Sequence, residues 1–281
     1  MDNSSLKILH AVSPADAKSY DTAAIRNHFL LENLQQKDSI QLVYTHYDRL
    51  IAGVANPVNG GVKLETYSNL KSENFLDRRE LGIINVGGEG SITVDGQEFV
   101  LNKYDCLYAG KGAKNIELKS SSADAPAVYF MLSAPAHQSF PVTLMKGADA
   151  MPATIGSQAT SNERTVYKYI HREGIQSCQL VMGLTRLAEG SVWNTMPAHV
   201  HDRRSEIYFY FDVPAGQGVL HFMGEPQQTR HMVLKNYEAI VSPSWSIHSG
   251  CGTSNYSFIW GMAGENIEYT DMDLCPIDVL K

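Results

Sequence analysis

Three histidines and one glutamate stand at a spacing that could bind a divalent metal ion. His199 and His201 are separated by one residue, and strand side chains alternate between two faces, so both imidazoles would lie on one face. Glu206 opens an aromatic and β-branched run, 206–211, which is typical of a strand. His248 comes from a distant segment, behind a proline turn. Three imidazole nitrogens and one carboxylate are a plausible set of metal ligands.

These ligands favour a class of metals rather than one element. Zn2+, Fe2+, Mn2+, Ni2+ and Co2+ all accept a mixture of nitrogen and oxygen donors. A lone histidine is usually an ordinary core or surface residue. A His-x-His pair with a glutamate soon after it and a late histidine favours a metal site, and one or two coordination positions would remain for substrate oxygens.

The elements that must position these residues are predicted to be short strands separated by glycine turns. This pattern is typical of a sandwich or a barrel rather than of βαβ units. Asp95-Gly96 lies between two alternating runs and predicts a tight hairpin. One short amphipathic helix is predicted within 21–33, with Asp21 or Thr22 as its N-cap. We therefore expect an all-β fold with a few short helices and a metal site inside a barrel.

Four features recur in the same order in both halves of the chain and indicate an internal duplication. Residues 77–80 (Asp-Arg-Arg-Glu) and 202–206 (Asp-Arg-Arg-Ser-Glu) each precede an apolar strand. A glycine turn and a hairpin follow in each half, and then similar segments that begin at Tyr104 and Tyr237. The first copy lacks the His-x-His pair and has no histidine at the position of His248. The sequence thus predicts two barrels of similar design, of which only the second binds metal.

This duplication sets the predicted domains. Residues 1–145 would form an N-terminal barrel without metal ligands, and residues 165–281 a C-terminal metal-binding barrel with an acidic tail. Residues 146–164 are rich in Pro, Ala, Ser, Thr and Asn and are the best candidate for a linker. We expect the tail, from Glu265 to Lys281, to pack on the outside of the barrel or on a neighbour.

Composition and charge exclude several classes of function. The 281 residues, 43% apolar and 19% charged, are ordinary for a globular protein of one large or two medium domains. A formal net charge of −7 without a block of Lys or Arg argues against nucleic acid as a partner. No apolar stretch predicts a membrane span, and no signal peptide is evident, so a cytoplasmic location is expected. Free thiols rather than disulfides or metal ligands are predicted for the scattered cysteines, Cys106, Cys178, Cys251 and Cys275.

The wider pattern resembles a known family. The His-x-His pair, the glutamate and the late histidine resemble the two motifs of the cupin superfamily. Three segments of the second half look like the family of 5-keto-4-deoxyuronate isomerases, namely 194–197 (Asn-Thr-Met-Pro), 223–231 (Met-Gly-Glu-Pro-Gln-Gln-Thr-Arg-His) and 242–250 (Ser-Pro-Ser-Trp-Ser-Ile-His-Ser-Gly). The first half agrees at 78–82 and 108–114. The resemblance covers nearly the whole chain.

The resemblance implies a fold, a metal and a reaction. The fold is two cupin-type barrels (double-stranded β-helix, or jelly-roll) in a homo-oligomer, a hexamer. One Zn2+ per chain would be bound by His199, His201, Glu206 and His248. The implied reaction interconverts 5-dehydro-4-deoxy-D-glucuronate and 3-deoxy-D-glycero-2,5-hexodiulosonate through an enediolate, in the breakdown of pectin and other unsaturated uronates. A 5-deoxyglucuronate isomerase of inositol breakdown, a non-catalytic sugar-acid-binding cupin and an oxygen-using Fe2+ cupin stay open as alternatives.

Several residues near the motifs suit an isomerase. A base must move a proton between neighbouring carbons, and it stays open between Glu206, Tyr208 and a metal-bound hydroxide. Tyr208 and Tyr210 share the strand parity of Glu206, and Trp260 could stack on a sugar face. The anionic substrate needs a cation, and Arg204 is our first candidate. The other candidates are Arg186, Arg203, Lys111 and Lys114.

Overall fold

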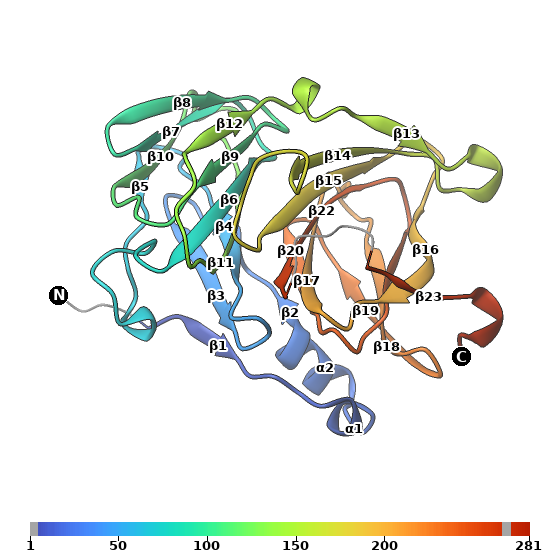
Figure 1. The fold of residues 1–281 in the computed structure, drawn as a ribbon. Helices are drawn as coiled ribbons and strands as arrows, with labels where there is room; N and C mark the ends of the chain where they lie inside the picture. The colour runs from blue at the N-terminus through green and yellow to red at the C-terminus, as the bar shows by residue number, and fades with distance from the viewer. Residues whose placement is uncertain (1–4, 266–270) are drawn as a thin grey trace.

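The first half of the chain forms two β-sheets (Figure 1). A computed structural model describes residues 5–265 and 271–281. One sheet has seven strands, β1 (Lys7–Leu9), β3 (Ile40–Thr45), β4 (Ile51–Ala55), β6 (Arg79–Asn85), β9 (Cys106–Ala109), β11 (Tyr129–Pro135) and β12 (Thr143–Met145). The other has four, β5 (Val62–Lys63), β7 (Gly90–Val94), β8 (Gln97–Leu101) and β10 (Ile116–Ser120). Their orders are β1-β3-β4-β11-β6-β9-β12 and β5-β10-β7-β8.

The second half forms two more sheets. A seven-stranded sheet contains β2 (Leu30–Leu31), β13 (Ala153–Ile155), β14 (Arg164–Ile170), β15 (Val181–Leu187), β17 (Arg204–Phe211), β20 (Glu238–Ser242) and β22 (Ser257–Gly264). A five-stranded sheet contains β16 (Trp193–Val200), β18 (Val219–Glu225), β19 (Gln228–Leu234), β21 (His248–Gly252) and β23 (Asp273–Cys275). Their orders are β13-β14-β15-β22-β17-β20-β2 and β19-β18-β21-β16-β23. The predicted fold class, all-β with a few short helices, is confirmed.

The helices are short. They are α1 (Pro14–Ala17), α2 (Thr22–Phe29) and the 3-10 turns η1 (Ser68–Leu70), η2 (Gly147–Asp149), η3 (Gln158–Thr160) and η4 (Ile277–Val279). The predicted helix within 21–33 is confirmed, and the Asp21 carboxylate accepts a hydrogen bond from the Ala24 N–H at 2.8 Å. The helix ends earlier than predicted, because Leu30 turns to an extended conformation and enters β2. Within the described ranges, none of the helices is long and apolar enough to cross a membrane.

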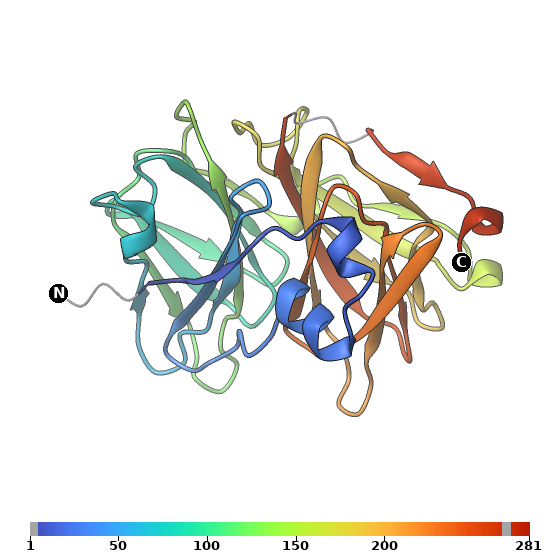
Figure 2. The ribbon, with the colours of Figure 1, turned by 90° about the horizontal axis from the view of Figure 1, so that it is seen from below.

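The N-terminal segment connects the two halves. β1 pairs in parallel with β3 of the first half, whereas β2 pairs with β20 of the second. Figure 2 shows both short helices over the strands of the second half, where α1 contacts β18 and α2 contacts β19. The Trp245 indole N–H donates to the Val12 carbonyl at 3.2 Å, and Arg230 donates to the Lys18 carbonyl at 2.9 Å. Residues 7–31 therefore lie across both halves, and the predicted domain boundaries stay a prediction.

The two regions predicted to be irregular both contain strands. Residues 146–164, predicted as a linker, contain β13, which pairs with β14. In the tail, β23 pairs with β16 at the edge of the five-stranded sheet. Residues 266–270 of the tail lie outside the described residues.

Strand pairing repeats between the halves and supports the predicted duplication. β6 lies between β9 and β11, and β17 lies between β20 and β22 in the same way. The hairpin predicted at Asp95-Gly96 is confirmed, since Val94 pairs with Gln97 across it. Tyr104 and Tyr237, which begin the two matching segments, both have positive φ, 74° and 64°. The equivalence rests on backbone geometry as well as on sequence.

One position distinguishes the interiors of the two halves. Leu81 on β6 lies opposite Ala109, and Glu206 on β17 lies opposite Ser242. Ala109 and Ser242 lie equally far beyond the two tyrosines, so Leu81 takes the place of Glu206 in the first half. A buried apolar cluster that includes Leu81, Ile83 and Leu107 fills that interior.

Glu80, the neighbour of Leu81, forms hydrogen bonds that connect the two halves of the chain. Its buried carboxylate accepts hydrogen bonds from the Tyr108 hydroxyl at 2.7 Å and from the backbone N–H groups of Cys178, Gln179 and Leu180 at 2.8, 2.9 and 2.8 Å. The loop that leads into β15 is therefore held by a side chain of the first half. Phe130 and Phe209 stack nearby across the two seven-stranded sheets, with ring centroids 4.5 Å apart.

Candidate metal centre

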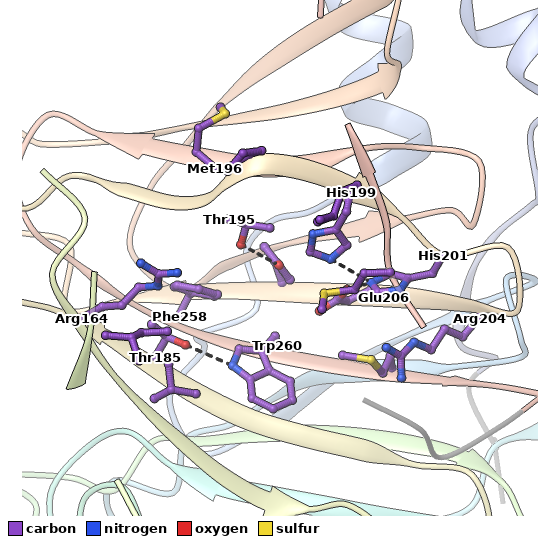
Figure 3. Close-up of a pocket in the computed structure, with 17 residues that line it drawn as sticks. Arg164, Thr185, Thr195, Met196, His199, His201, Arg204, Glu206, Phe258 and Trp260 are labelled. Carbon is purple, nitrogen blue, oxygen red and sulfur yellow. Dashed lines mark hydrogen bonds and ion pairs between the residues drawn. The ribbon is translucent and has the colours of Figure 1, made fainter. Parts of the chain in front are cut away.

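Three imidazoles and one carboxylate converge at one end of a cavity in the second half. Figure 3 shows the side chains of His199, His201 and Glu206 there. Nε2 of His199 lies 3.1 Å from Nε2 of His201 and 2.9 Å from Nε2 of His248. Oε2 of Glu206 lies 3.2 Å from Nε2 of His201 and 3.1 Å from Nε2 of His248. All four side chains are buried. The fold thus brings together the four ligands predicted from the sequence.

Both sheets of the second half contribute to this cluster. His199 on β16 lies directly opposite His248 on β21 in the five-stranded sheet. His201 follows just beyond the end of β16, and its Nε2 reaches the same point as that of His199, as the one-residue spacing predicts. Glu206 comes from β17 of the seven-stranded sheet. The donors therefore meet between the two sheets.

The charge state of the imidazoles favours a cation among them. Burial, with further contributions from His201 and Arg204, lowers the pKa of His199 to about 3. Burial and the neighbouring imidazoles hold the pKa of His248 well below its ordinary value. Both rings are thus neutral near pH 7. Nδ1 of His248 lies 3.2 Å from the Ser242 hydroxyl, which can accept a hydrogen bond from an N–H group at Nδ1. In that tautomer Nε2 carries the lone pair.

The positions of the donors fit a single divalent ion. Oε2 of Glu206 is buried and has no hydrogen-bond partner in the part of the chain that the structure describes. A buried carboxylate oxygen without a partner is costly. Ligands about 2.0–2.2 Å from one ion lie roughly 3.0–3.5 Å from their neighbours, and the separations of 2.9–3.2 Å measured here are close to that range.

Asp271 supports the cluster from outside, and sequence reasoning missed it. Its Oδ1 lies 3.4 Å from Nδ1 of His201, and its backbone carbonyl lies 3.3 Å from the same nitrogen. The same carboxylate oxygen forms a 2.5 Å ion pair with Arg204, whose side chain is fully buried. A carboxylate on the outer nitrogen of a ligand histidine fixes its tautomer and orientation. Asp271 belongs to no motif, and no spacing rule points from the tail to this site.

The cavity has a volume of about 280 Å³ and is walled in layers that follow the strand register. Met262 lies opposite Glu206, Trp260 opposite Tyr208, and Phe258 opposite Thr185. Its lining residues are Ile155, Arg164, Val166, Thr185, Thr195, Met196, Pro197, His199, His201, Arg204, Glu206, Tyr208, Phe258, Trp260, Met262, Met272 and Leu274. The cavity therefore combines a polar cluster with apolar walls, as small-molecule sites commonly do.

Two wall residues are held by hydrogen bonds to threonines. The Tyr208 hydroxyl lies 3.1 Å from the Thr195 hydroxyl, and the Trp260 indole N–H donates to the Thr185 hydroxyl at 3.1 Å. The indole passes over Gly183, where a Cβ would lie 2.1 Å from the ring. Only glycine leaves room for Trp260 in this position.

Some of the predicted substrate contacts line the cavity, and others lie elsewhere. Arg204, Tyr208 and Trp260 line the cavity. Tyr210 instead lies in the core, 2.7 Å from Nδ1 of His221. Among the described residues, the lining does not include the other four proposed cations, Arg186, Arg203, Lys111 and Lys114. It does include Arg164, which we did not predict, although it shares strand parity with Val166 of the same wall.

Comparison with known proteins gives consistent results. The family described as KduI/IolB matches residues 30–275. A 4-deoxy-L-threo-5-hexosulose-uronate ketol-isomerase of Formosa agariphila is 54% identical over 97% of this chain and 97% of that protein. The protein of the same name from Halalkalibacterium halodurans is 50% identical over 97% of this chain and 99% of its own.

Solved structures support the fold. The crystal structure of an IolB-like protein from Salmonella typhimurium LT2 superimposes with a TM-score of 0.72 at 16% identity, over 88% of this chain and 96% of that chain. An oxalate decarboxylase from Lactobacillus farciminis, solved as a formate complex, gives a TM-score of 0.55 at 10% identity, over 80% of this chain and 79% of that chain. At these identities the likeness concerns the fold alone.

Proposed function

The chain belongs to the KduI/IolB family, and we propose from this premise that it is a metal-dependent 4-deoxy-L-threo-5-hexosulose-uronate ketol-isomerase. In this reaction 5-dehydro-4-deoxy-D-glucuronate becomes 3-deoxy-D-glycero-2,5-hexodiulosonate through an enediolate. The observation that carries the proposal is the buried cluster of three imidazoles and one carboxylate, of which His199, His201 and Glu206 line a cavity. Relatives of about half identical sequence carry the name of this enzyme over nearly their full length.

We propose that His199, His201, Glu206 and His248 bind one Zn2+ ion per chain. Nitrogen and oxygen donors in this number suit zinc, although other divalent transition metals accept them too. When bound, the ion would act as a Lewis acid toward the carbonyl and hydroxyl oxygens of the substrate. Asp271 would keep His201 in the orientation and tautomer that the ligand role requires.

The proton transfer falls to side chains beside the cluster. An aldose–ketose isomerisation removes a proton from the carbon next to the carbonyl and returns a proton to the neighbouring carbon. Tyr208 is the wall residue beside the cluster whose hydroxyl is placed for this, with its ring centroid 5.2 Å from that of His248. The hydroxyl of Thr195, 3.1 Å from the Tyr208 oxygen, can donate a hydrogen bond to that oxygen or accept one from it. Glu206 is the second group that could take this role.

The apolar walls give the substrate a dry surface. Trp260 and Phe258 lie along one side of the cavity, and the hydrogen bond from Trp260 to Thr185 fixes the indole in place. A sugar acid can lay its carbon skeleton against such rings while its oxygens face the cluster. Exclusion of water from this surface would also strengthen the electrostatic interactions at the reacting end.

The metabolic role, the cellular location and the assembly are part of the same proposal. We propose a role in the breakdown of pectin and other unsaturated uronates, a cytoplasmic location and a homohexameric assembly. The role and the assembly are supported by the family resemblance, and the location is the expectation from the sequence. Gel filtration with light scattering would test the assembly, and a mass near that of one chain would contradict it.

The decisive experiment is turnover of 5-dehydro-4-deoxy-D-glucuronate by the purified protein, with and without a chelator, together with elemental analysis. We expect turnover that the chelator abolishes and that Zn2+ restores, with about one ion per chain. A parallel assay with 5-deoxyglucuronate separates the substrate proposed here from that of the inositol pathway. Full activity in the absence of metal would refute the metal-dependent mechanism.

A further inference from the structure

The substrate named above has its reacting carbons and its charge at opposite ends. A ketol isomerisation needs a carbonyl next to a carbon that bears a hydroxyl group. In a 4-deoxy-5-hexosulose uronate the C5 ketone lies between a CH2 group and the C6 carboxylate, so only C1 and C2 form such a pair. The C6 carboxylate is therefore the group farthest from the metal-binding cluster. This argument rests on the proposed function.

Arg204 is placed at the wrong end for that carboxylate. Its guanidinium forms an ion pair with Asp271, which in turn contacts His201. Arg204 also stands two residues before Glu206 on the same strand, β17, which places its charge beside the cluster. Arg204 therefore serves the reacting end of the cavity through Asp271, rather than the distant end.

Arg164 lies at the other end of the same cavity. Figure 3 shows its guanidinium across the cavity from His201, Glu206 and Arg204. The strand register agrees, because Arg164 pairs with Leu187, two residues beyond Thr185 along β15. Each two-residue step along a strand is about 6.6 Å. Arg164 thus belongs to a layer beyond Thr185 and Phe258, whereas Glu206 lies in the layer of Met262.

A hydrogen bond orients the side chain of Arg164. It is half-buried on the cavity wall, and Nη1 donates to the carbonyl of Asn162 at 2.8 Å. That bond fixes the direction of the guanidinium fork. A planar fork held in this way suits bidentate recognition of a carboxylate.

We propose that Arg164 binds the C6 carboxylate of the substrate and thereby sets which end of the sugar acid reaches the metal-binding cluster. Arg164 contributes selectivity for a uronate over the corresponding neutral sugar.

The test compares Arg164→Gln and Arg164→Lys with a control, Arg172→Gln. Arg172 is exposed, lies in the turn between β14 and β15, and is not among the described residues that line the cavity. Each variant would be assayed with the uronate and with its methyl ester, whose carboxyl group carries no charge. Thermal melting checks that each variant is folded.

We expect Arg164→Gln to raise KM for the uronate by about 10- to 100-fold, because a charge-assisted hydrogen-bonded pair is lost. KM for the methyl ester should change by less than about threefold, since that substrate has no charge to pair. KM of Arg164→Lys for the uronate should lie between the values of the wild type and of Arg164→Gln. KM of Arg172→Gln should equal that of the wild type. An unchanged KM of Arg164→Gln for the uronate, with the wild type active, would overturn the role of Arg164 while leaving the proposed function intact.

Binding of D-galacturonate, measured by calorimetry, keeps the inference testable if the wild type turns over no uronate. The absence of turnover would refute the proposed function by itself. Binding to the wild type and to Arg172→Gln, but not to Arg164→Gln, would support the anion site. Equal affinity in all three proteins, or no binding to the wild type, would overturn it.

Discussion

Oδ1 of Asp271 lies 3.4 Å from Nδ1 of His201 and, on its other side, 2.5 Å from Nη2 of Arg204. One carboxylate thus joins a candidate metal ligand to a buried arginine. Removing its charge would release the ring of His201 and take away the carboxylate that pairs with the buried Arg204. Both effects act on the cluster without changing any of the four donors.

We therefore predict that Asp271→Asn lowers metal affinity by about 10- to 100-fold, because carboxylates behind ligand histidines commonly contribute that much. The measurement is competition for Zn2+ against a chromophoric chelator. Asp273→Asn is the control, since Asp273 is exposed on β23, two residues away. Equal affinity for the metal in both variants would show that Asp271 does not position His201.

The metal-free protein should lose stability as the pH falls. His199 has a pKa of about 3 in the folded protein, against an ordinary value of 6.5, and the pKa of His248 is also lowered. Above pH 6.5 both rings are neutral in the folded and unfolded states. Below it the unfolded chain binds protons that the folded protein does not, so stability falls between about pH 6.5 and pH 3. Thermal melting of the metal-free protein across this range measures the effect.

His199→Gln should flatten that dependence, because one of the buried histidines with a lowered pKa, which also include His221 and His248, is gone. Its melting temperature would then fall less between pH 6.5 and pH 4 than that of the metal-free wild type. Identical slopes for the two proteins would mean that the acid sensitivity arises elsewhere, for example from the many surface carboxylates.

Tyr208→Phe tests the proton transfer. Loss of the hydroxyl should lower kcat by about 10²-fold or more, with a smaller change in KM, because general acid–base groups contribute on that scale. The phenyl ring keeps the packing against Phe258, so the fold should be preserved. Thr195→Val removes the hydroxyl that contacts Tyr208 and should give a milder loss. A wild-type kcat in Tyr208→Phe would direct attention to Glu206.

Glu80→Ala should weaken the connection between the halves. Three backbone N–H groups and the Tyr108 hydroxyl would lose their buried acceptor. We expect a loss of about 3–5 kcal/mol in the free energy of unfolding, since each buried unsatisfied donor costs about 1 kcal/mol or more. Urea unfolding followed by tryptophan fluorescence measures it. Glu98→Ala, at an exposed position on β8, is the control and should change stability by less than about 0.5 kcal/mol.

Local rules were sufficient to predict much of this structure. Strand parity placed His199 and His201 together, and the turn chemistry of Asp95-Gly96 predicted its hairpin. The N-cap at Asp21 could also be predicted from the sequence, because a cap depends on only three residues. The predicted duplication assigned Glu206 and His248 to the same half of the chain, and the two side chains do meet there.

Contacts between distant segments could not be predicted in this way. Asp271 reaches the site from the tail just before β23, and Arg164 from the end of the expected linker, and neither lies in a motif. Leu30 left the helical pattern because pairing with Ile240 overrides its local preference. Tyr210 has the parity of Tyr208 but lies deeper, where His221 contacts its hydroxyl. Strand parity predicts the face of the strand on which a side chain lies, but not whether it reaches the cavity or lies deeper in the core.

The pairing of β2 with β20 has a consequence for how the chain is made. Leu31 leaves the ribosome before its partner Ala239, which follows roughly 200 residues later, and at 5–20 residues per second this means a delay on the order of 10–40 s. During that time Leu30 and Leu31, both buried in the finished protein, cannot pair with β20. The nascent chain therefore carries an exposed apolar segment until β20 is made, and chaperone binding or translation speed would affect its yield. A chain without residues 1–31 would avoid this delay but would leave the edge of β20 open to other chains.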